Sequence, residues 1–203
     1  MGRKSLAVQR KEQILDAFER CVVRNGLDGV TIEQIANEAD VMPSIIRHYI
    51  GNWNDLVREL VHRTIRRYDM MIDELSKASK GHDVVPRMLE NMYPVTSEAA
   101  DREKFVLGLL MTAKDRYPET KEMILDLLRK ATTSMGEALH RTYPNTPKET
   151  CDQVAYSLIC ISITNDIAKN MGMDLRYTEG ARVSAEALIN FLETMNRARD
   201  DRL

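Results

Sequence analysis

Histidine and cysteine are the residues of this chain best suited to metal binding or covalent chemistry. The histidines are His48, His62, His82 and His140, and the cysteines are Cys21, Cys151 and Cys160. No histidine stands at ligand spacing from a cysteine or acidic residue in a recognisable motif, and no glycine-rich phosphate-binding loop occurs. We therefore expect no enzyme activity, no cofactor and no metal site. A thiol sensor using Cys151 or Cys160 is an alternative, although we expect Cys160 to be buried and therefore inert.

Composition and charge indicate a globular protein with a basic N-terminal segment. The 203 residues are 43% hydrophobic and 30% charged, which is typical of folded rather than disordered chains and allows one large domain or two small ones. Although the net charge is −2, Arg3, Lys4, Arg10 and Lys11 precede the first acidic residue, Glu12. Alone, such a cluster would be a solvated tail. Because no long apolar run and no signal peptide are present, we expect a cytoplasmic protein without a membrane span.

Apolar residues recur with the 3.6-residue period of an α-helix along almost the whole chain, and strand-like alternation is absent. Helices are predicted over residues 8–25, 31–39, 43–50, 52–79, 84–93, 97–116, 118–142, 147–171 and 178–199. The predicted fold class is therefore all-α. We expect an N-terminal three-helix helix-turn-helix domain over residues 1–52, joined by the long fourth helix to a larger helical domain over residues 53–203.

Two segments have the sequence pattern of a helix N-terminus. In Thr31-Ile32-Glu33-Gln34, a threonine and a glutamine three residues later can form a capping box, in which each side chain pairs with the backbone N–H of the other residue. Thr146-Pro147-Lys148-Glu149 combines the same pattern with a proline at the first helical position. We therefore expect Thr31 and Thr146 to cap the helices that follow them.

The segment 31–50 has the features of a helix-turn-helix, in which the second helix enters the major groove of DNA and the first braces it. Ala36 and Ala39 are small enough for close helix crossing, and Val41 fills the turn. Ile46 and Ile50 are predicted to anchor the second helix in the core. These assignments leave an outward face made of Pro43, Ser44, Ile45, Arg47 and His48, with Met42 at its rim.

Residues 8–68 resemble the DNA-binding region of the TetR family of bacterial transcriptional regulators. The match is carried by Ala39-Asp40-Val41-Met42-Pro43-Ser44-Ile45-Ile46-Arg47-His48-Tyr49-Ile50, by Asn52 and Asp55-Leu56, and by Gly26 and Thr31-Ile32 upstream. The sequence departs from the family pattern at four positions. Asp40 replaces a usual glycine, and Ile50 replaces a usual aromatic residue. Gly51 and Trp53 occupy positions where the family often has lysines that contact phosphates.

The resemblance implies a role for each residue of this segment. Tyr49 and Thr31 would donate hydrogen bonds to phosphates. The residues nearest the base edges would be Met42, Pro43, Ser44, Ile45 and His48. Arg47 would reach either a guanine or a phosphate, and Ile45 would either pack on a thymine methyl group or lie partly buried against the first helix. The remaining predicted DNA contacts are Lys4, Arg10, Lys11 and Trp53.

We expect a homodimer, because one such domain reads only a few base pairs and two copies would read a palindromic double-stranded DNA operator. The last two predicted helices offer an interface with a heptad-like seam. The predicted interface residues are Leu158, Ile161, Ala181, Ala185, Leu188, Leu192 and Met195, of which the last five form the seam. Ordinary packing within one chain is the alternative explanation of the same seam.

The resemblance further implies a repressor that a small apolar or amphipathic effector releases from DNA, with the effector bound in the C-terminal domain. The predicted effector residues are Met88, Met92, Phe105, Met111, Tyr117, Met123, Met135, Tyr156 and Asn165. Methionines can line an adaptable cavity, but at helical spacing they also form plain core. A regulator with no small-molecule effector, constitutive or controlled by a protein partner, is the alternative.

Overall fold

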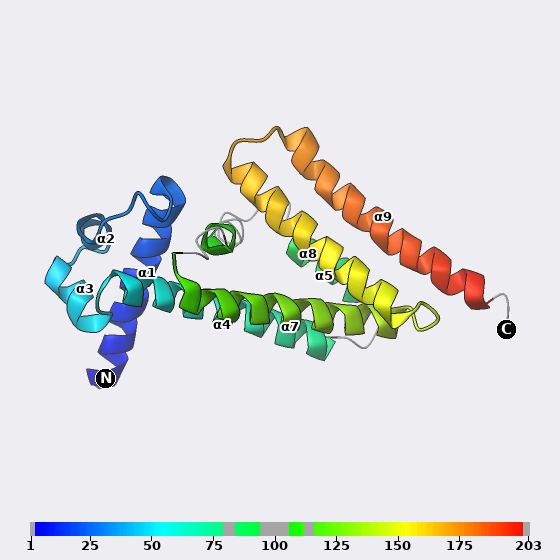
Figure 1. The fold of residues 1–203 in the computed structure, drawn as a ribbon, viewed down its shortest axis with the longest axis horizontal. Coiled ribbons are helices and arrows are strands. Elements are labelled where there is room, and N and C mark those ends of the chain that lie inside the picture. The colour runs from blue at the N-terminus through cyan, green and yellow to red at the C-terminus, as the bar shows by residue number, and fades with distance from the viewer. Residues whose placement is uncertain (1–2, 79–83, 94–105, 112–115, 201–203) are drawn as a thin grey trace. The chain divides into compact units, whose positions relative to one another are not determined.

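The computed structural model describes residues 3–78, 84–93, 106–111 and 116–200 (Figure 1). Its elements are α1 (Arg3–Asn25), α2 (Ile32–Glu38), α3 (Pro43–Tyr49), α4 (Trp53–Ala78), α5 (Val84–Met92), α7 (Pro118–Thr142), α8 (Lys148–Asn170) and α9 (Leu175–Asp200). Residues 106–111 are also helical. Within the described ranges no residue forms a strand, so the predicted all-α fold class is confirmed.

The helix boundaries differ from the predicted ones by more than one residue at three places. Helix α1 begins at Arg3 rather than near residue 8, and α9 begins at Leu175 rather than 178. Of the predicted helix 97–116, residues 106–111 are helical, while 97–105 and 112–115 lie outside the described residues. The early start of α1 means that the basic N-terminal residues from Arg3 onward lie on a helix rather than on an extended arm.

The chain divides into two compact units that do not follow the predicted boundary at residue 52. The first unit contains Met1–Arg66 and Phe105–Ile124, and the second contains Arg67–Lys104 and Leu125–Leu203. The N-terminal half of α4 belongs to the first unit because its apolar residues, among them Leu56 and Leu60, are completely buried there. The division of function between residues 1–52 and 53–203 stays a prediction, since compactness does not identify a binding region.

The core of the first unit is formed where α1, α2, α3 and the start of α4 pack together. Its completely buried side chains are Ile14, Leu15, Ala17, Phe18, Ile35, Ala36, Ile46, Leu56, Val57, Leu60 and Val61. Helices α2 and α3 lie next to each other and to α1 (Figure 1). Ile46 of α3 reaches this core, as its spacing predicted. Apolar packing therefore holds α3 in place.

In the second unit, α8 and α9 lie side by side, and α5 and part of α7 complete a shared apolar core (Figure 1). Leu139, Leu158 and Leu192 are fully buried in it. The hydroxyl of Tyr93 donates to the carbonyl of Leu158 at 2.9 Å, which fixes the end of α5 against the middle of α8. Among the described residues, no helix has the length and apolar character that crossing a membrane requires.

The predicted capping box at Thr146 is wrong. Helix α8 starts at Lys148 with Pro147 as its N-cap, so Thr146 lies one position too early to cap it. Its hydroxyl instead donates to the carbonyl of Leu192 at 3.3 Å, and the residue is 1% exposed. This contact with α9 was not visible in the local sequence.

Candidate nucleic-acid interface

The capping box predicted at Thr31 is confirmed and sets the start of α2. The Gln34 N–H donates to Thr31 Oγ1 at 3.2 Å, and the Thr31 N–H donates to Gln34 Oε1 at 2.8 Å. Because the Thr31 hydroxyl accepts within the chain, its own proton remains available for an outside acceptor. Thr31 is exposed, as a phosphate contact would require.

The turn between α2 and α3 is built around Asp40, which has a φ of 51°. Aspartate is one of the non-glycine residues that adopt this left-handed region most readily, so the tight turn forms without the usual glycine. The Asp40 N–H donates to the Asn37 carbonyl at 3.2 Å, and the Val41 N–H donates to the Ala36 carbonyl at 2.9 Å. These bonds fix the direction in which α3 leaves α2.

Side chains of α1 hold the C-terminal end of α2. Gln13 Nε2 donates to the Ala39 carbonyl at 2.6 Å, and Arg20 Nε donates to Glu38 Oε1 at 2.6 Å. Arg24 also donates to Glu38. The hydrogen bonds from Arg24 and Arg20 lower the pKa of the Glu38 carboxyl below its ordinary value, because they stabilise its charged form.

Helix α3 has one buried side and one side turned to solvent. Ile46 is completely buried, whereas Ile45 and Tyr49 are half-buried. The exposed positions of α3 and of the residue before it are Met42, Pro43, Ser44, Arg47 and His48. The His48 and Tyr49 rings make an edge contact at a centroid distance of 5.0 Å. Ser44, Arg47 and His48 together offer hydrogen-bond donors and acceptors of the kinds that can pair with polar base edges.

The start of α4 contains a second reciprocal cap, which the sequence analysis missed. The Asn52 N–H donates to Asp55 Oδ2 at 2.9 Å, and the Asp55 N–H donates to Asn52 Oδ1 at 3.1 Å. Gly51 precedes this cap with a φ of 121°, and a Cβ on it would lie 2.3 Å from Asp55 Oδ2. A side chain at position 51 would therefore meet both an unfavourable backbone conformation and the Asp55 carboxylate. The Asn-x-x-Asp spacing was the available signal.

Trp53, a predicted DNA contact, directs its indole N–H toward its own chain. Nε1 donates to the Tyr117 hydroxyl at 2.6 Å, and the indole ring meets Phe18 in an edge contact at 5.4 Å between centroids. This donor is therefore already engaged within the first unit. Tyr117, a predicted effector residue, is buried beside it.

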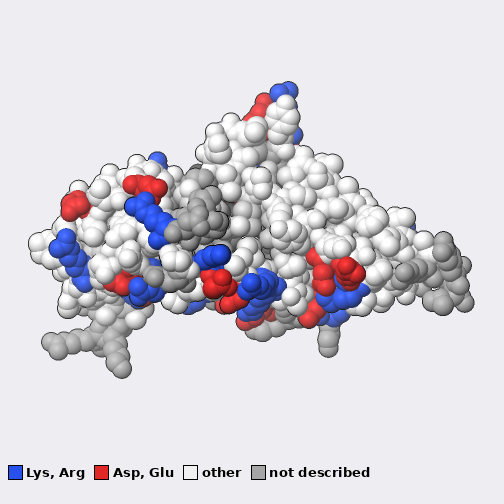
Figure 2. All heavy atoms as spheres, in the orientation of Figure 1, with Lys and Arg blue, Asp and Glu red and all other residues white. Residues whose placement is uncertain are grey.

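The predicted basic contacts lie on α1, and two of them have partners within the protein. Arg10 Nη1 donates to Gln13 Oε1 at 2.8 Å, and Lys11 Nζ lies 2.7 Å from Glu59 Oε2. The side chain of Lys4 is outside the described part. On the face shown in Figure 2, basic and acidic side chains lie next to one another in mixed clusters.

The predicted effector residues are distributed over both units. Met88, Tyr117, Met135 and Asn165 are buried, Met92, Met111 and Met123 are half-buried, and Phe105 lies outside the described residues. Tyr156 is 59% exposed, because it occupies a solvent-facing side of α8 rather than an interior wall. The sequence pattern could not distinguish these environments.

Three of the predicted interface residues are enclosed by their own chain. Leu158, Ala185 and Leu192 each have 0% exposure and belong to the core of the second unit, which is the alternative that the sequence left open. Ile161, Ala181, Leu188 and Met195 are only partly buried. Exposed apolar residues that were not predicted for the interface lie on the same two helices: Tyr156, Val183 and Phe191.

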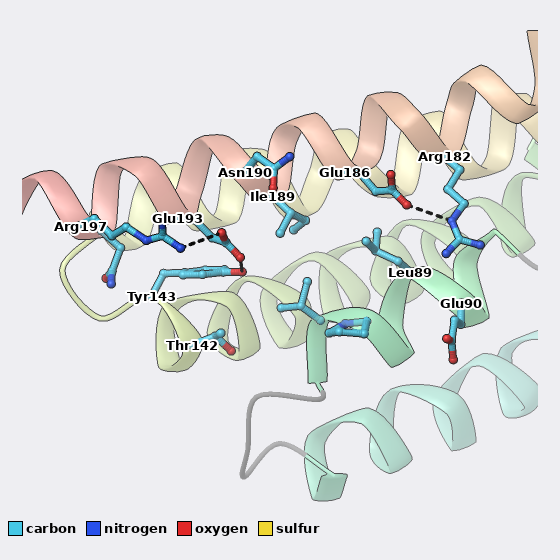
Figure 3. A pocket seen from close by; sticks show the side chains of 13 residues that line it. Leu89, Glu90, Thr142, Tyr143, Arg182, Glu186, Ile189, Asn190, Glu193 and Arg197 are labelled. Carbon is cyan, nitrogen blue, oxygen red and sulfur yellow. Dashed lines mark hydrogen bonds and ion pairs between the residues drawn. The ribbon is translucent and has the colours of Figure 1, made fainter.

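A cavity of about 480 Å³ lies along α5, the end of α7 and α9, within the second unit (Figure 3). None of the nine predicted effector residues lines it. Its walls combine apolar side chains from α5 and α9 with arginines, glutamates and Tyr143. Burial, together with the neighbouring Glu193, raises the pKa of Tyr143 to about 12, so the hydroxyl stays protonated and donates to Glu193 Oε1 at 3.5 Å.

The cysteines differ in exposure from the prediction. Cys151 is buried and Cys160 is partly exposed, whereas Cys160 was expected to be the buried one. Burial raises the pKa of the Cys151 thiol, which lowers the fraction of reactive thiolate. Within the described ranges, no three histidine, cysteine or acidic side chains form a group that could hold a metal ion.

Comparisons with known proteins agree with this arrangement. No protein-family model matches the chain. The HTH-type transcriptional regulator BetI of Brucella melitensis biotype 2 is 25% identical over 93 residues, which are 45% of this chain and 47% of BetI. The chain thus matches about half the length of this curated relative.

Solved structures match over nearly the full length. A putative TetR-family transcriptional regulator from Mesorhizobium loti superposes with a TM-score of 0.70 at 14% identity, covering 95% of this chain and 97% of the other. The chain has the TetR-family fold. The multidrug binding protein EbrR complexed with malachite green also superposes on the chain, with a TM-score of 0.60 at 17% identity, covering 88% of this chain and 97% of EbrR. The resemblance to the TetR family is thereby confirmed.

Proposed function

We propose that this protein is a DNA-binding transcriptional regulator that represses by occupying its operator. The observation that carries the proposal is the outer side of α3, where Ser44, Arg47 and His48 are exposed on a helix anchored by Ile46. The likeness to BetI, which is named as a transcriptional regulator of the helix-turn-helix type, supports it. In this function α3 enters the major groove and α2 braces it across the backbone.

We propose two different tasks for the residues of this segment that face solvent at least in part. Thr31 and Tyr49 would contact phosphates and set the register of the protein on the duplex, without reading sequence. Ser44, Arg47 and His48 would reach base edges. Ile45 is half-buried, which favours packing against the first helix over contact with a thymine methyl group. Met42 and Pro43 are exposed and would lie near the base edges at the rim of the groove.

The protein would bind as a two-fold dimer with recognition helices about 34–36 Å apart, matching two half-sites of a near-palindrome. Because Leu158, Ala185 and Leu192 are already covered, the partner would meet the outer sides of α8 and α9. The exposed apolar side chains of Tyr156, Val183 and Phe191 supply surface for such a contact.

Release from DNA by a small apolar or amphipathic molecule is the regulatory part of this proposal. Its support is the likeness to EbrR, a protein whose structure contains malachite green. Such a molecule must bind the DNA-incompetent state more tightly, and each tenfold loss of DNA affinity requires about 1.4 kcal/mol of coupling. The competing proposal is the same DNA-binding protein without a small-molecule effector.

In vitro selection of binding sites from random duplex DNA tests the central proposal. The selected sequences should contain an inverted repeat, and log affinity should fall with log salt by about 0.9 for each neutralised phosphate. Equal affinity for selected and random duplexes at low salt would refute sequence-specific binding.

Substitutions within the segment test the assignment of residues. Tyr49→Phe should weaken binding to all duplexes by a similar factor, because it removes a phosphate contact. Arg47→Ala and His48→Ala should also relax the preference at particular base pairs, by about 1–3 kcal/mol where the contact is bidentate. Arg141→Ala, an exposed arginine on α7, serves as the control. If all three segment variants act alike on every sequence, the reading side is misplaced.

A further inference from the structure

Gln13 of α1 joins an arginine to the turn that leads into α3. Its Nε2 donates to the Ala39 carbonyl at 2.6 Å, and its Oε1 accepts from Arg10 Nη1 at 2.8 Å. Ala39 is the C-cap of α2, where backbone carbonyls have no partner inside the helix, so the Gln13 amide supplies a donor that the helix cannot. Because the carbonyl needs a donor and the guanidinium needs an acceptor, the two contacts fix the orientation of the amide.

This chain of contacts places Arg10 beside the start of α3. The turn continues from Ala39 to Met42, which is the N-cap of α3 and is 66% exposed. In a helix-turn-helix the N-terminal residues of the second helix contact the base edges. Arg10 therefore lies next to the part of the segment that would come closest to the duplex.

Arg10 differs from other cations of α1 in the charge of its partner. Lys11 Nζ lies 2.7 Å from Glu59 Oε2, and Arg20 Nε lies 2.6 Å from Glu38 Oε1. Each of these two cations would have to leave a carboxylate in order to bind a phosphate. Arg10 is held by a neutral amide, and among the described residues it forms no ion pair. It uses one N–H for that bond, so the other N–H groups of its guanidinium can serve a second acceptor.

We propose that Arg10 binds a phosphate of the DNA backbone, that Gln13 is the positioning residue that holds it there, and that Lys11 makes no such contact. The proposal rests on the DNA-binding function proposed above, and it separates two neighbouring cations to which the sequence assigned the same role. A guanidinium that is oriented in advance loses less side-chain freedom on binding than a flexible one. Two of its N–H groups can then meet a phosphate as a parallel pair. Gln13 itself touches no DNA and acts through Arg10.

The salt dependence of DNA binding counts neutralised phosphates and therefore tests the difference between Arg10 and Lys11. Fluorescence anisotropy of the full chain with a labelled duplex from the in vitro selection gives log affinity against log salt. Arg10→Gln keeps an amide donor for Gln13 but removes the charge, so the slope should become shallower by about 0.9 for each bound domain. The affinity at about 0.1 M salt should fall about eightfold per domain, since a slope of about 0.9 accumulates over the tenfold span from about 1 M.

Lys11→Gln is the matched control, because it removes the same charge one residue away. Its slope should equal that of the unaltered protein, since Glu59 already neutralises Lys11. An unchanged slope in Arg10→Gln, or an equal change in both variants, would overturn the proposed phosphate contact.

Gln13→Ala tests the positioning role. It should weaken binding about threefold without changing the slope, because Arg10 still reaches the phosphate but loses more side-chain freedom in doing so. In the Arg10→Gln background the same substitution should have no further effect. An equal loss with and without Arg10 would mean that Gln13 acts only through the Ala39 carbonyl, and would overturn its positioning role.

The unaltered protein separates these outcomes from a failure of the proposed function. If it selects an operator while Arg10→Gln keeps its slope, the DNA-binding function stands and the phosphate contact of Arg10 is wrong. If the unaltered protein prefers no duplex, the DNA-binding function itself is refuted, and the phosphate contact with it.

Discussion

The hydrogen bond between Trp53 and Tyr117 joins two residues that are 64 positions apart, and its contribution can be measured. Trp53→Phe removes the indole N–H donor, and a phenyl ring can keep part of the edge contact with Phe18. A hydrogen bond of this kind contributes about 0.5–1.5 kcal/mol net to stability. Tyr117→Phe removes the acceptor and leaves the part-buried N–H without it, which should cost about 1–3 kcal/mol.

A double-mutant cycle isolates the interaction. Urea unfolding followed by circular dichroism should give a coupling free energy of about 1 kcal/mol between Trp53→Phe and Tyr117→Phe. Tyr177→Phe is the control, because Tyr177 is exposed on α9 and its ring contact with Arg176 does not use the hydroxyl. A coupling free energy below about 0.3 kcal/mol, which is within the error of additivity, would show that the bond does not hold these segments together.

The same variant tests whether Trp53 touches DNA. Because its N–H is engaged by Tyr117, Trp53→Phe should leave the slope of log affinity against log salt unchanged. A slope reduced by about 0.9 would mean that Trp53 helps to bind a phosphate and that the internal bond opens on DNA.

Two further predictions concern local structure around α2, α3 and α4. Gly51→Ala should destabilise the protein by more than about 1 kcal/mol, because position 51 has a positive φ and a Cβ there would clash with Asp55. Gly180→Ala on α9 is the control, because a Cβ at position 180 meets no other atom, and it should not destabilise the protein. Equal melting temperatures of the two variants would contradict this account. Since the pKa of Glu38 is lowered by Arg24 and Arg20, its contribution is present above the ordinary glutamate range and lost as the pH falls below about 4. The urea concentration at the unfolding midpoint should therefore fall less steeply at acid pH in Glu38→Gln than in the unaltered protein. An unchanged pH dependence would rule out this role of Glu38.

The sequence by itself was sufficient where structure depends on neighbouring residues. The capping box at Thr31 and the burial of Ile46 both follow from patterns spanning a few positions. Helical periodicity likewise predicted the all-α class and most helix boundaries. These features need no knowledge of distant contacts, because capping, turn geometry and periodicity are short-range properties of the chain.

The tertiary structure decided which partner each buried or polar group meets. Periodicity indicated that Leu158 and Leu192 are covered, but only the packing showed that their own chain covers them. The hydroxyl of Thr146 bonds to Leu192 rather than to α8, and the indole of Trp53 bonds to Tyr117. The cavity beside α5 and α9 is lined by residues more than 90 positions apart in the chain, such as Leu89 and Ile189. Hydrophobic burial has no direction, so a sequence can specify an apolar side without specifying what it packs against.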